Sequence, residues 1–223
     1  MSNLLFFNQL VSEDLTDVIA LVATIVVAIL ILTVCLLASK HKLKTQDIVY
    51  AGVSLSASFV LSFIKIAPVQ YGGSITLASF VPLLIYTYYF GFSRGLICGL
   101  IYGVLQFIQS PYILTPVTFL LDYLLAFASI AVMGLFSKNK NKTSAFILGT
   151  LGVYAFRFLM HFISGIIYFN MGAIWVSLPA SSAVLYSFLY QVVYLVPDAL
   201  LCIIAILILS KSNTIDKIKP KNS

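Results

Sequence analysis

Long apolar runs separated by short polar segments dominate the chain. Seven of these runs are predicted to cross a membrane as helices, because a spanning helix needs about 20 mostly apolar residues. They are residues 17–38, 48–66, 75–92, 95–109, 113–136, 144–169 and 182–210. The fourth run is short and needs its flanks to span. No competing strand-like alternation is seen, so the pattern predicts an all-α, polytopic membrane helix bundle.

The first run is set apart by a polar linker, residues 39–47. We therefore expect three parts. Residues 1–43 would be an extension with an extra N-terminal transmembrane helix, 44–211 a six-helix substrate-binding membrane domain, and 212–223 a basic cytoplasmic tail. Glu13 and Asp14 lie where a secretory signal peptide would be basic, so the first run is predicted to remain as a helix.

The composition points to lipid as the main solvent of this chain. Apolar residues make up 61% of it and charged residues only 9%, with a mean hydropathy of +1.06. Soluble domains carry roughly 25% charged residues, so a multi-pass protein of the cell membrane is predicted. The cysteines, Cys35, Cys98 and Cys202, all lie within apolar runs and have neither disulfide nor metal-ligand spacing, so we interpret them as core residues.

The net charge of +6 does not indicate nucleic-acid binding, because the basic residues form short clusters between the spans. With seven spans, eleven of the thirteen Lys and Arg residues fall on one side of the membrane. Six spans would divide these clusters between the two sides. The positive-inside rule then predicts a cytoplasmic C-terminus and an external N-terminus.

The predicted outer loops are aromatic and glycine-containing rather than charged. They are residues 65–74, 110–111 and 170–181, and they carry Tyr71, Gly72, Gly73 and Trp175. One interpretation is an interfacial aromatic belt with turn glycines. The other is a lid over an outward-facing cavity, and loop composition leaves both open.

Four ionisable residues are predicted to lie within the spans: Asp122, Arg157, His161 and Asp198. Each costs at least about 2.5–3.5 kcal/mol in hydrocarbon, so such residues usually face the bundle interior and mark a site. Arg157 and His161 are four residues apart and share a helix face, with Asp122 as the expected counter-charge of Arg157. Asp198 follows Pro197 and is expected near the cytoplasmic interface, where it would snorkel or accompany a kink.

Counting about 1.5 Å per residue along each helix predicts that five polar groups converge in the outer half of the membrane. They are Asp122, Arg157, His161, Tyr186 and Gln191. A carboxylate, a guanidinium, an imidazole and several aromatics suit recognition of a flat, polar heteroaromatic molecule. A purely structural Asp–Arg pair that joins two helices is the alternative.

Enzymatic chemistry is not indicated by the motifs of this chain. It contains no HExxH motif, no paired carboxylates, no Gly-x-Ser-x-Gly elbow and no phosphate-binding loop. We therefore expect no catalytic residue, no metal site and no cofactor, and ATP hydrolysis would have to come from other subunits. A small intramembrane enzyme that uses Asp122, Arg157 and His161 remains the alternative, although no nucleophile or metal ligand accompanies His161.

Six segments, taken in order, resemble the thiamine-specific substrate-binding subunits (ThiT family) of energy-coupling factor (ECF) transporters. They are QYGGSITLAS at 70–79, VPLLIY at 81–86, GLIYGVLQ at 99–106, FLLDYLLAF at 119–127, RFLMHFISG at 157–165 and YSFLYQ at 186–191. The likeness extends over about residues 44–210. The ordered set, above all the basic-x-x-x-His segment after an acidic-Tyr pair, is more specific than any single piece.

The resemblance implies a six-helix subunit that captures thiamine from outside the cell. It implies a membrane partner, EcfT, and two cytoplasmic ATPases that power release inward. The candidate ligand-binding residues are Asp122, Tyr123, Arg157, His161, Phe169, Tyr186 and Gln191, with Tyr71 in the matched outer loop. The small residues expected to form the docking face for the partner are Ala51, Gly52, Ser54, Ser56 and Ala57.

Three features depart from the family pattern. Gln191 occupies a position that is often Asn, Phe169 one where Trp can occur, and the first apolar run is additional to the usual core. The two substitutions motivate an alternative ligand, a thiamine precursor or another vitamin.

Overall fold

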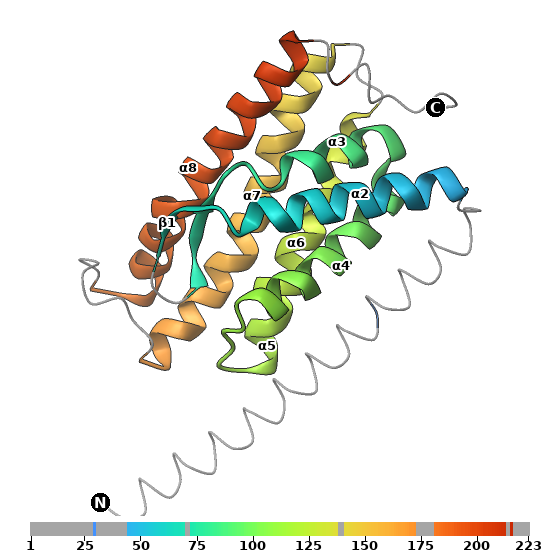
Figure 1. Ribbon diagram of the computed structural model, residues 1–223. Coiled ribbons are helices and arrows are strands. Elements are labelled where there is room, and N and C mark those ends of the chain that lie inside the picture. Colours follow the sequence, from blue (N-terminus) through green and yellow to red (C-terminus); the bar gives the residue numbers. More distant parts are fainter. Residues whose placement is uncertain are drawn as a thin grey trace, which may run out of the picture.

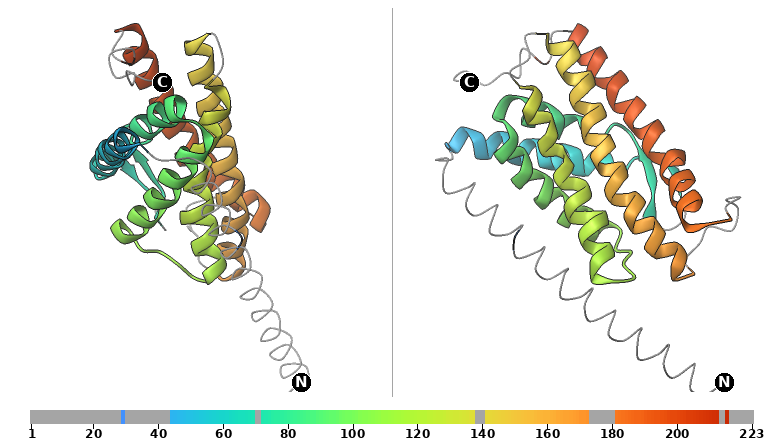
Figure 2. Two further views of the ribbon diagram at one scale, coloured as in Figure 1. Left: turned by 90° about the vertical axis from the view of Figure 1, so that its right-hand side faces the viewer. Right: turned by 180° about the vertical axis from the view of Figure 1, so that it is seen from behind.

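The computed structural model describes residues 44–69, 72–137, 141–172 and 181–212, together with Ile29 and Ile215. Apart from Ile29, the predicted first span lies outside these residues, as does most of the predicted basic tail. The described part is a bundle of helices with one small β-hairpin (Figures 1 and 2), so the predicted all-α membrane fold class is confirmed.

Four long helices correspond closely to predicted spans. They are α4 (Phe92–Gln109), a continuous rod (Pro116–Phe136), α7 (Lys142–Asn170) and α8 (Ala183–Lys211). Each begins and ends within three residues of its prediction, and each is long and apolar enough to cross a membrane. The rod consists of α5 (Pro116–Phe119), η2 (Leu120–Leu125), α6 (Ala126–Ala128) and η3 (Ser129–Phe136).

The prediction of one continuous helix over residues 75–92 is wrong. Its first residues belong to strand β2 (Ser74–Thr76), which pairs antiparallel with β1 (Lys65–Pro68), and the helix that follows, α3 (Val81–Phe90), has only ten residues. Pro82 suits the first turn of α3 because its missing N–H needs no partner there. The predicted helix at 48–66 is shorter for the same reason, since α2 (Thr45–Ser62) ends before β1.

The long helices enclose an aromatic interior. Helices α7 and α8 run antiparallel and side by side, and α2 crosses the bundle obliquely (Figure 1). At the centre, the Phe80 ring lies between those of Tyr102, Phe127 and Tyr154, with centroid distances of 5.6–5.9 Å. Cys98 and Cys202 are buried free thiols, which confirms their interpretation as core residues, whereas Cys35 lies outside the described residues.

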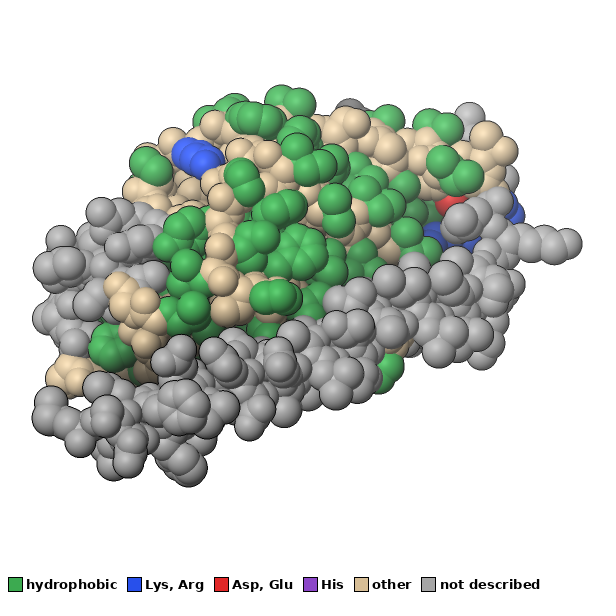
Figure 3. Space-filling model, turned by 90° about the horizontal axis from the view of Figure 1, so that it is seen from below, with side chains coloured by type: hydrophobic (Ala, Val, Ile, Leu, Met, Phe, Trp, Pro, Cys, Tyr) green, Lys and Arg blue, Asp and Glu red, His purple; other side chains and the backbone are tan. Residues whose placement is uncertain are grey.

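Apolar side chains cover much of the outer surface. From below, the described surface is mainly hydrophobic, with few charged groups (Figure 3). Exposed residues such as Val53, Leu159, Leu200 and Ile208 would meet water in a soluble protein. Arg94, near the start of α4, and Asp47, in the first turn of α2, form an ion pair of 2.9 Å. The chain is a multi-pass membrane protein whose outward faces contact lipid.

Candidate functional site

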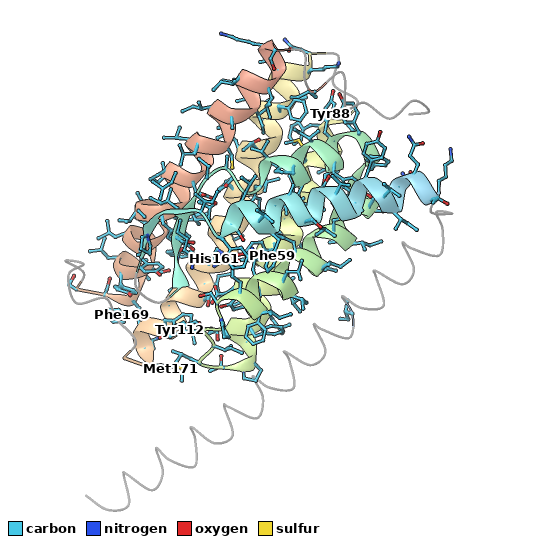
Figure 4. All side chains as sticks on the ribbon, in the orientation of Figure 1. Phe59, Tyr88, Tyr112, His161, Phe169 and Met171 are labelled. Atoms are coloured by element: carbon cyan, nitrogen blue, oxygen red, sulfur yellow. The ribbon has the colours of Figure 1, made fainter. Side chains whose placement is uncertain are left out.

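A cavity lies between the β-hairpin, the C-terminal end of α4, η2, α7 and α8. Six of the eight predicted site residues line it: Asp122, Tyr123, Arg157, His161, Tyr186 and Gln191. The others that line it are Lys65, Gly72, Gly73, Ser74, Gln106, Gln109, Ser110, Tyr112, Phe127, Gly165, Tyr168, Tyr190 and Tyr194. In Figure 4, His161 lies well inside the bundle, while Tyr112, Phe169 and Met171 lie toward the end where α7 finishes.

A π-helical turn positions the acidic residue of the cavity. Asp122 and Tyr123 are sequence neighbours in η2, and both line the cavity. A π-helix is wider than an α-helix, and single turns of it are frequent at functional sites. Gly103 of α4 allows this turn to pack closely, because a Cβ there would collide with the Tyr123 carbonyl oxygen.

Both carboxylate oxygens of Asp122 are held by α7. His161 Nδ1 lies 2.8 Å from Oδ1, and the Ser164 hydroxyl donates to Oδ2 over 2.6 Å. The Asp122 side chain remains 16% exposed, although Ser164 is buried. The carboxylate is thus oriented in advance while keeping access to the cavity.

The hydrogen bonds of His161 indicate its tautomer. Arg157 Nε, which can only donate, points at His161 Nε2 over 3.4 Å. Nε2 therefore accepts, and the ring proton lies on Nδ1, from where it is donated to Asp122. A neutral His161 stabilises the Asp122 carboxylate without cancelling its charge.

The predicted Asp122–Arg157 pair is wrong, because Arg157 faces a different carboxylate. Its NH1 lies 3.6 Å from Asp198 Oδ2, whereas Asp122 binds His161 and Ser164. Arg157 lies one turn before His161 on α7, and this turn brings it level with Asp198 of α8. The predicted snorkelling of Asp198 toward the cytoplasmic interface is also wrong, since its side chain is buried and hydrogen-bonded to Thr76 of the hairpin and Tyr154 of α7.

Asp198 is the centre of a buried polar cluster. Its Oδ1 accepts from the backbone N–H and the hydroxyl of Thr76, each over 2.9 Å. Its Oδ2 accepts from the Tyr154 hydroxyl over 2.6 Å. With the Arg157 ion pair, these donors account for both oxygens of a side chain that is only 2% exposed.

Two aromatic rings hold the guanidinium of Arg157. Its Cζ lies 4.5 Å from the ring centroid of Phe80 and 4.9 Å from that of Phe127. A cation over an aromatic face gains about 2 kcal/mol or more where water is excluded. These contacts fix the charge at the inner end of the cavity.

The Gln191 amide joins α8 to α7 and presents an acceptor. Its Nε2 donates to the His161 carbonyl oxygen over 3.1 Å. Its Oε1 is buried and has no hydrogen-bond partner among the described residues. An unsatisfied acceptor is costly in a buried site, so this oxygen suits a ligand donor.

Tyrosines form much of the cavity wall. The Tyr123 hydroxyl donates to the Ser110 carbonyl oxygen and accepts from the Tyr112 N–H, and the Tyr112 and Tyr168 rings stack with centroids 5.4 Å apart. The site residues predicted from the sequence do not include Tyr112, Tyr168, Tyr190 or Tyr194. The spacing of Tyr186, Tyr190 and Tyr194 at every fourth residue places them on one face of α8 and could have indicated the last two.

The β-hairpin covers one side of the cavity. The Gly73 N–H donates to the Tyr190 hydroxyl over 3.2 Å, and a Cβ on Gly73 would lie only 2.8 Å from that oxygen. Gly72 has a φ of 92°, which favours glycine. Gly72 and Gly73 therefore line the cavity, which is compatible with the lid interpretation, while the opening of the cavity to the outside stays a prediction.

Two predicted residues are not among the cavity lining. Phe169 lies beside it, with its ring centroid 5.4 Å from that of Tyr186. Tyr71 lies outside the described residues. Within the described part of the chain, no group of three His, Cys, Asp or Glu side chains could hold a metal ion.

Comparisons with known proteins agree on one family. The sequence model of the family described as Thiamine transporter protein (Thia_YuaJ) matches residues 48–217. The thiamine transporter ThiT of Bacillus subtilis (strain 168) is 32% identical over 154 residues, which cover 62% of this chain and 75% of that protein. A solved structure of ThiT from Listeria monocytogenes matches with a TM-score of 0.64 at 24% identity, covering 75% of this chain and 94% of that one, and supports the fold.

Proposed function

The chain belongs to the thiamine transporter protein family, and from that premise we propose that it binds thiamine in the cavity between η2, α7 and α8. The family is one of transporters rather than enzymes. The observation that carries the proposal is the Asp122 carboxylate, held at both oxygens by His161 and Ser164 and open to an aromatic cavity.

Thiamine joins an aminopyrimidine to a positively charged thiazolium ring, and the groups in the cavity complement both. The Asp122 carboxylate can accept from the exocyclic amine, and the free Gln191 Oε1 can accept a second hydrogen bond. The rings of Tyr186 and its neighbours offer faces on which a heteroaromatic cation stacks. We propose that Tyr123, Arg157 and His161 hold these ligand-binding groups in position.

Two further residues are proposed from the resemblance. Phe169 would extend the aromatic surface beside Tyr186, since their rings are in contact. Tyr71 would belong to the outer loop above the cavity. Gln191 and Phe169 replace residues common in related proteins, so a thiamine precursor or another vitamin is the alternative ligand.

We propose that the chain is the substrate-binding subunit of an ECF-type importer, with an EcfT subunit and two ATPases as partners. Helix α2 offers a docking face of small residues, because Gly52 and Ser56 are exposed one turn apart. A Cβ on Gly52 would meet nothing within 4 Å. Small residues let another helix approach closely within a membrane.

The proposed orientation has the C-terminus in the cytoplasm and the N-terminus outside. Lys44 caps the start of α2, and Arg94, Lys142 and Lys211 lie in the first or last turn of α4, α7 and α8. Basic residues at these helix ends support this orientation under the positive-inside rule. Green fluorescent protein fused after Ser223 should fluoresce in intact bacteria, and a dark fusion at normal expression would contradict this orientation.

Calorimetric titration of the purified chain tests the ligand directly. We expect saturable thiamine binding below micromolar concentration, with much weaker binding of the isolated aminopyrimidine and of the isolated thiazolium. His161→Ala should greatly weaken binding, because Asp122 loses its Nδ1–H donor. Tighter binding of either half-molecule than of thiamine would favour the precursor alternative, and wild-type affinity in His161→Ala would favour a purely structural role.

A further inference from the structure

The Asp198–Arg157 ion pair lies at the boundary of the cavity with only one partner inside it. Arg157 lines the cavity, but Asp198 does not. Asp198 lies behind the guanidinium, at 3.6 Å, and is only 2% exposed. A carboxylate in this position can influence a ligand in the cavity only through Arg157, not by contact.

The Asp198–Arg157 ion pair changes the sum of the formal charges around the cavity. Asp122 is negative and Arg157 is positive, while His161 donates to Asp122 as a neutral ring. Without Asp198, the charges of Arg157 and Asp122 would cancel. With Asp198, the pair is neutral and the charge of Asp122 remains.

Lys65 is the other cation among the residues that line the cavity. Its side chain is exposed at the start of β1, where water and salt screen its charge. Arg157 and Asp198 are buried, and charges in such surroundings interact far more strongly than they would in water. The buried charges therefore dominate the potential inside the cavity.

We propose that Asp198 is a specificity-determining residue that makes the cavity select a cation. It neutralises Arg157 from behind, so that the negative charge of Asp122 is left for a positively charged ligand ring. The inference rests on the proposed function, because thiamine carries such a ring. It adds a residue outside the cavity that sets the sign of the charge inside it.

Asp198 also has a structural role that a test must separate from its charge. It accepts two hydrogen bonds from Thr76 and thereby fastens β2 to α8. Loss of this attachment would disturb the hairpin above the cavity and weaken every ligand alike. Loss of the charge would weaken a cation selectively.

The test compares thiamine with 3-deazathiamine, an isostere whose thiophene ring is uncharged. Calorimetry on the purified full chain gives the dissociation constant of each, and the ratio of neutral to cationic ligand measures the preference for the cation. We expect Asp198→Asn to lower this preference by about tenfold or more. Thr76→Val, which removes one hydrogen bond to Asp198 and no charge, should weaken both ligands equally.

A second pair of variants covers the case in which an unpaired Arg157 prevents folding of Asp198→Asn. Arg157→Gln should raise the preference for the cation, because Asp198 then adds its own negative charge. Adding Asp198→Asn to that variant should lower the preference by about the same factor as in the unaltered protein. The effect of Asp198→Asn on the preference for the cation is thus measured both in the unaltered protein and in Arg157→Gln. Either measurement is sufficient for the test.

Asp47→Asn is the matched control. Asp47 is a buried carboxylate that pairs with Arg94 near the start of α2 and α4, and neither residue lines the cavity. The preference of the Asp47→Asn variant for the cation should remain that of the unaltered protein. The inference would be overturned if Asp198→Asn left the preference for the cation unchanged in a folded protein. It would also be overturned if Asp47→Asn lowered this preference as much as Asp198→Asn does. Failure of the unaltered protein to bind thiamine would instead contradict the proposed function on which it rests.

Discussion

The Asp122 carboxylate concentrates the chemistry of the site in one side chain. Its two oxygens already receive donors from His161 and Ser164, so a ligand meets an acceptor whose direction is fixed. Such preorganisation reduces the ordering cost of binding. The tyrosines around it help to leave the Asp122 side chain only 16% exposed, and a polar contact is stronger where little water competes for it.

Asp122→Ala should weaken thiamine binding by about 2–5 kcal/mol, because the His161 Nδ1–H, the Ser164 hydroxyl and the ligand amine all lose their acceptor. Calorimetry on the purified variant measures the loss. Ser164→Ala, which removes one donor and no charge, serves as the control and should cost much less. Near wild-type affinity in Asp122→Ala would show that the ligand lies elsewhere.

At the residue scale, the sequence predicted which polar groups converge but not how they pair. Depth along a helix follows from counting residues, so Asp122, His161 and Gln191 could be assigned to one level. Pairing depends on helix rotation and on the hairpin, which the count does not include. Asp198 was misassigned because its main partner, Thr76, lies 122 residues away in a strand that the sequence did not reveal.

At the element scale, the π-helical turn η2 and its contact with α4 decide where Asp122 and Tyr123 point. Close packing there depends on Gly103, since a side chain would meet the Tyr123 carbonyl oxygen. The backbone of η2 is thus supported directly by the backbone of α4. A change in this contact should reach the cavity through the backbone of Tyr123, without replacing any side chain that lines it.

Gly103→Ala should destabilise the protein by about 1–3 kcal/mol through overpacking and should weaken thiamine binding. Gly52→Ala is the control, because a Cβ on Gly52 meets nothing within 4 Å and alanine favours a helix by up to about 1 kcal/mol. Thermal unfolding in detergent and ligand titration measure both effects. Equal behaviour of the two variants would contradict a role for the α4–η2 contact.

The long helices were predictable because their apolar runs are unbroken, whereas the hairpin was not. Strands β1 and β2 are three to four residues long and follow an apolar helix, so their residues read as a continuation of the spans. The tertiary contacts of the hairpin with α8, through Gly73 and Thr76, stabilise it. The π-helical turn likewise leaves no periodic signal in six residues.

At the scale of the whole molecule, lipid-facing helices enclose the cavity that Asp122 lines. The outward faces carry exposed apolar side chains, and the buried charges are paired within the bundle. The membership of the thiamine transporter family, first suggested by six ordered segments, is confirmed over residues 48–217. The three-part division at residues 43 and 211 stays a prediction.

Transport should require partner subunits, because the sequence contains no ATP-binding loop. We expect no thiamine accumulation by the chain alone in liposomes, and ATP-dependent accumulation with an EcfT subunit and its two ATPases. Ser56→Leu on the exposed face of α2 should abolish accumulation while leaving thiamine binding intact, because it fills the proposed docking face. Accumulation by the chain alone would contradict this division of labour.

The position of bound thiamine is the most direct test of the proposed binding site. An experimental structure of the purified chain with thiamine should have ligand density between η2, α7 and α8, with the aminopyrimidine amine within hydrogen-bond distance of an Asp122 carboxylate oxygen. Thiamine bound on any other face of the bundle, or bound in the cavity with Asp122 turned away from it, would contradict a site built around the Asp122 carboxylate.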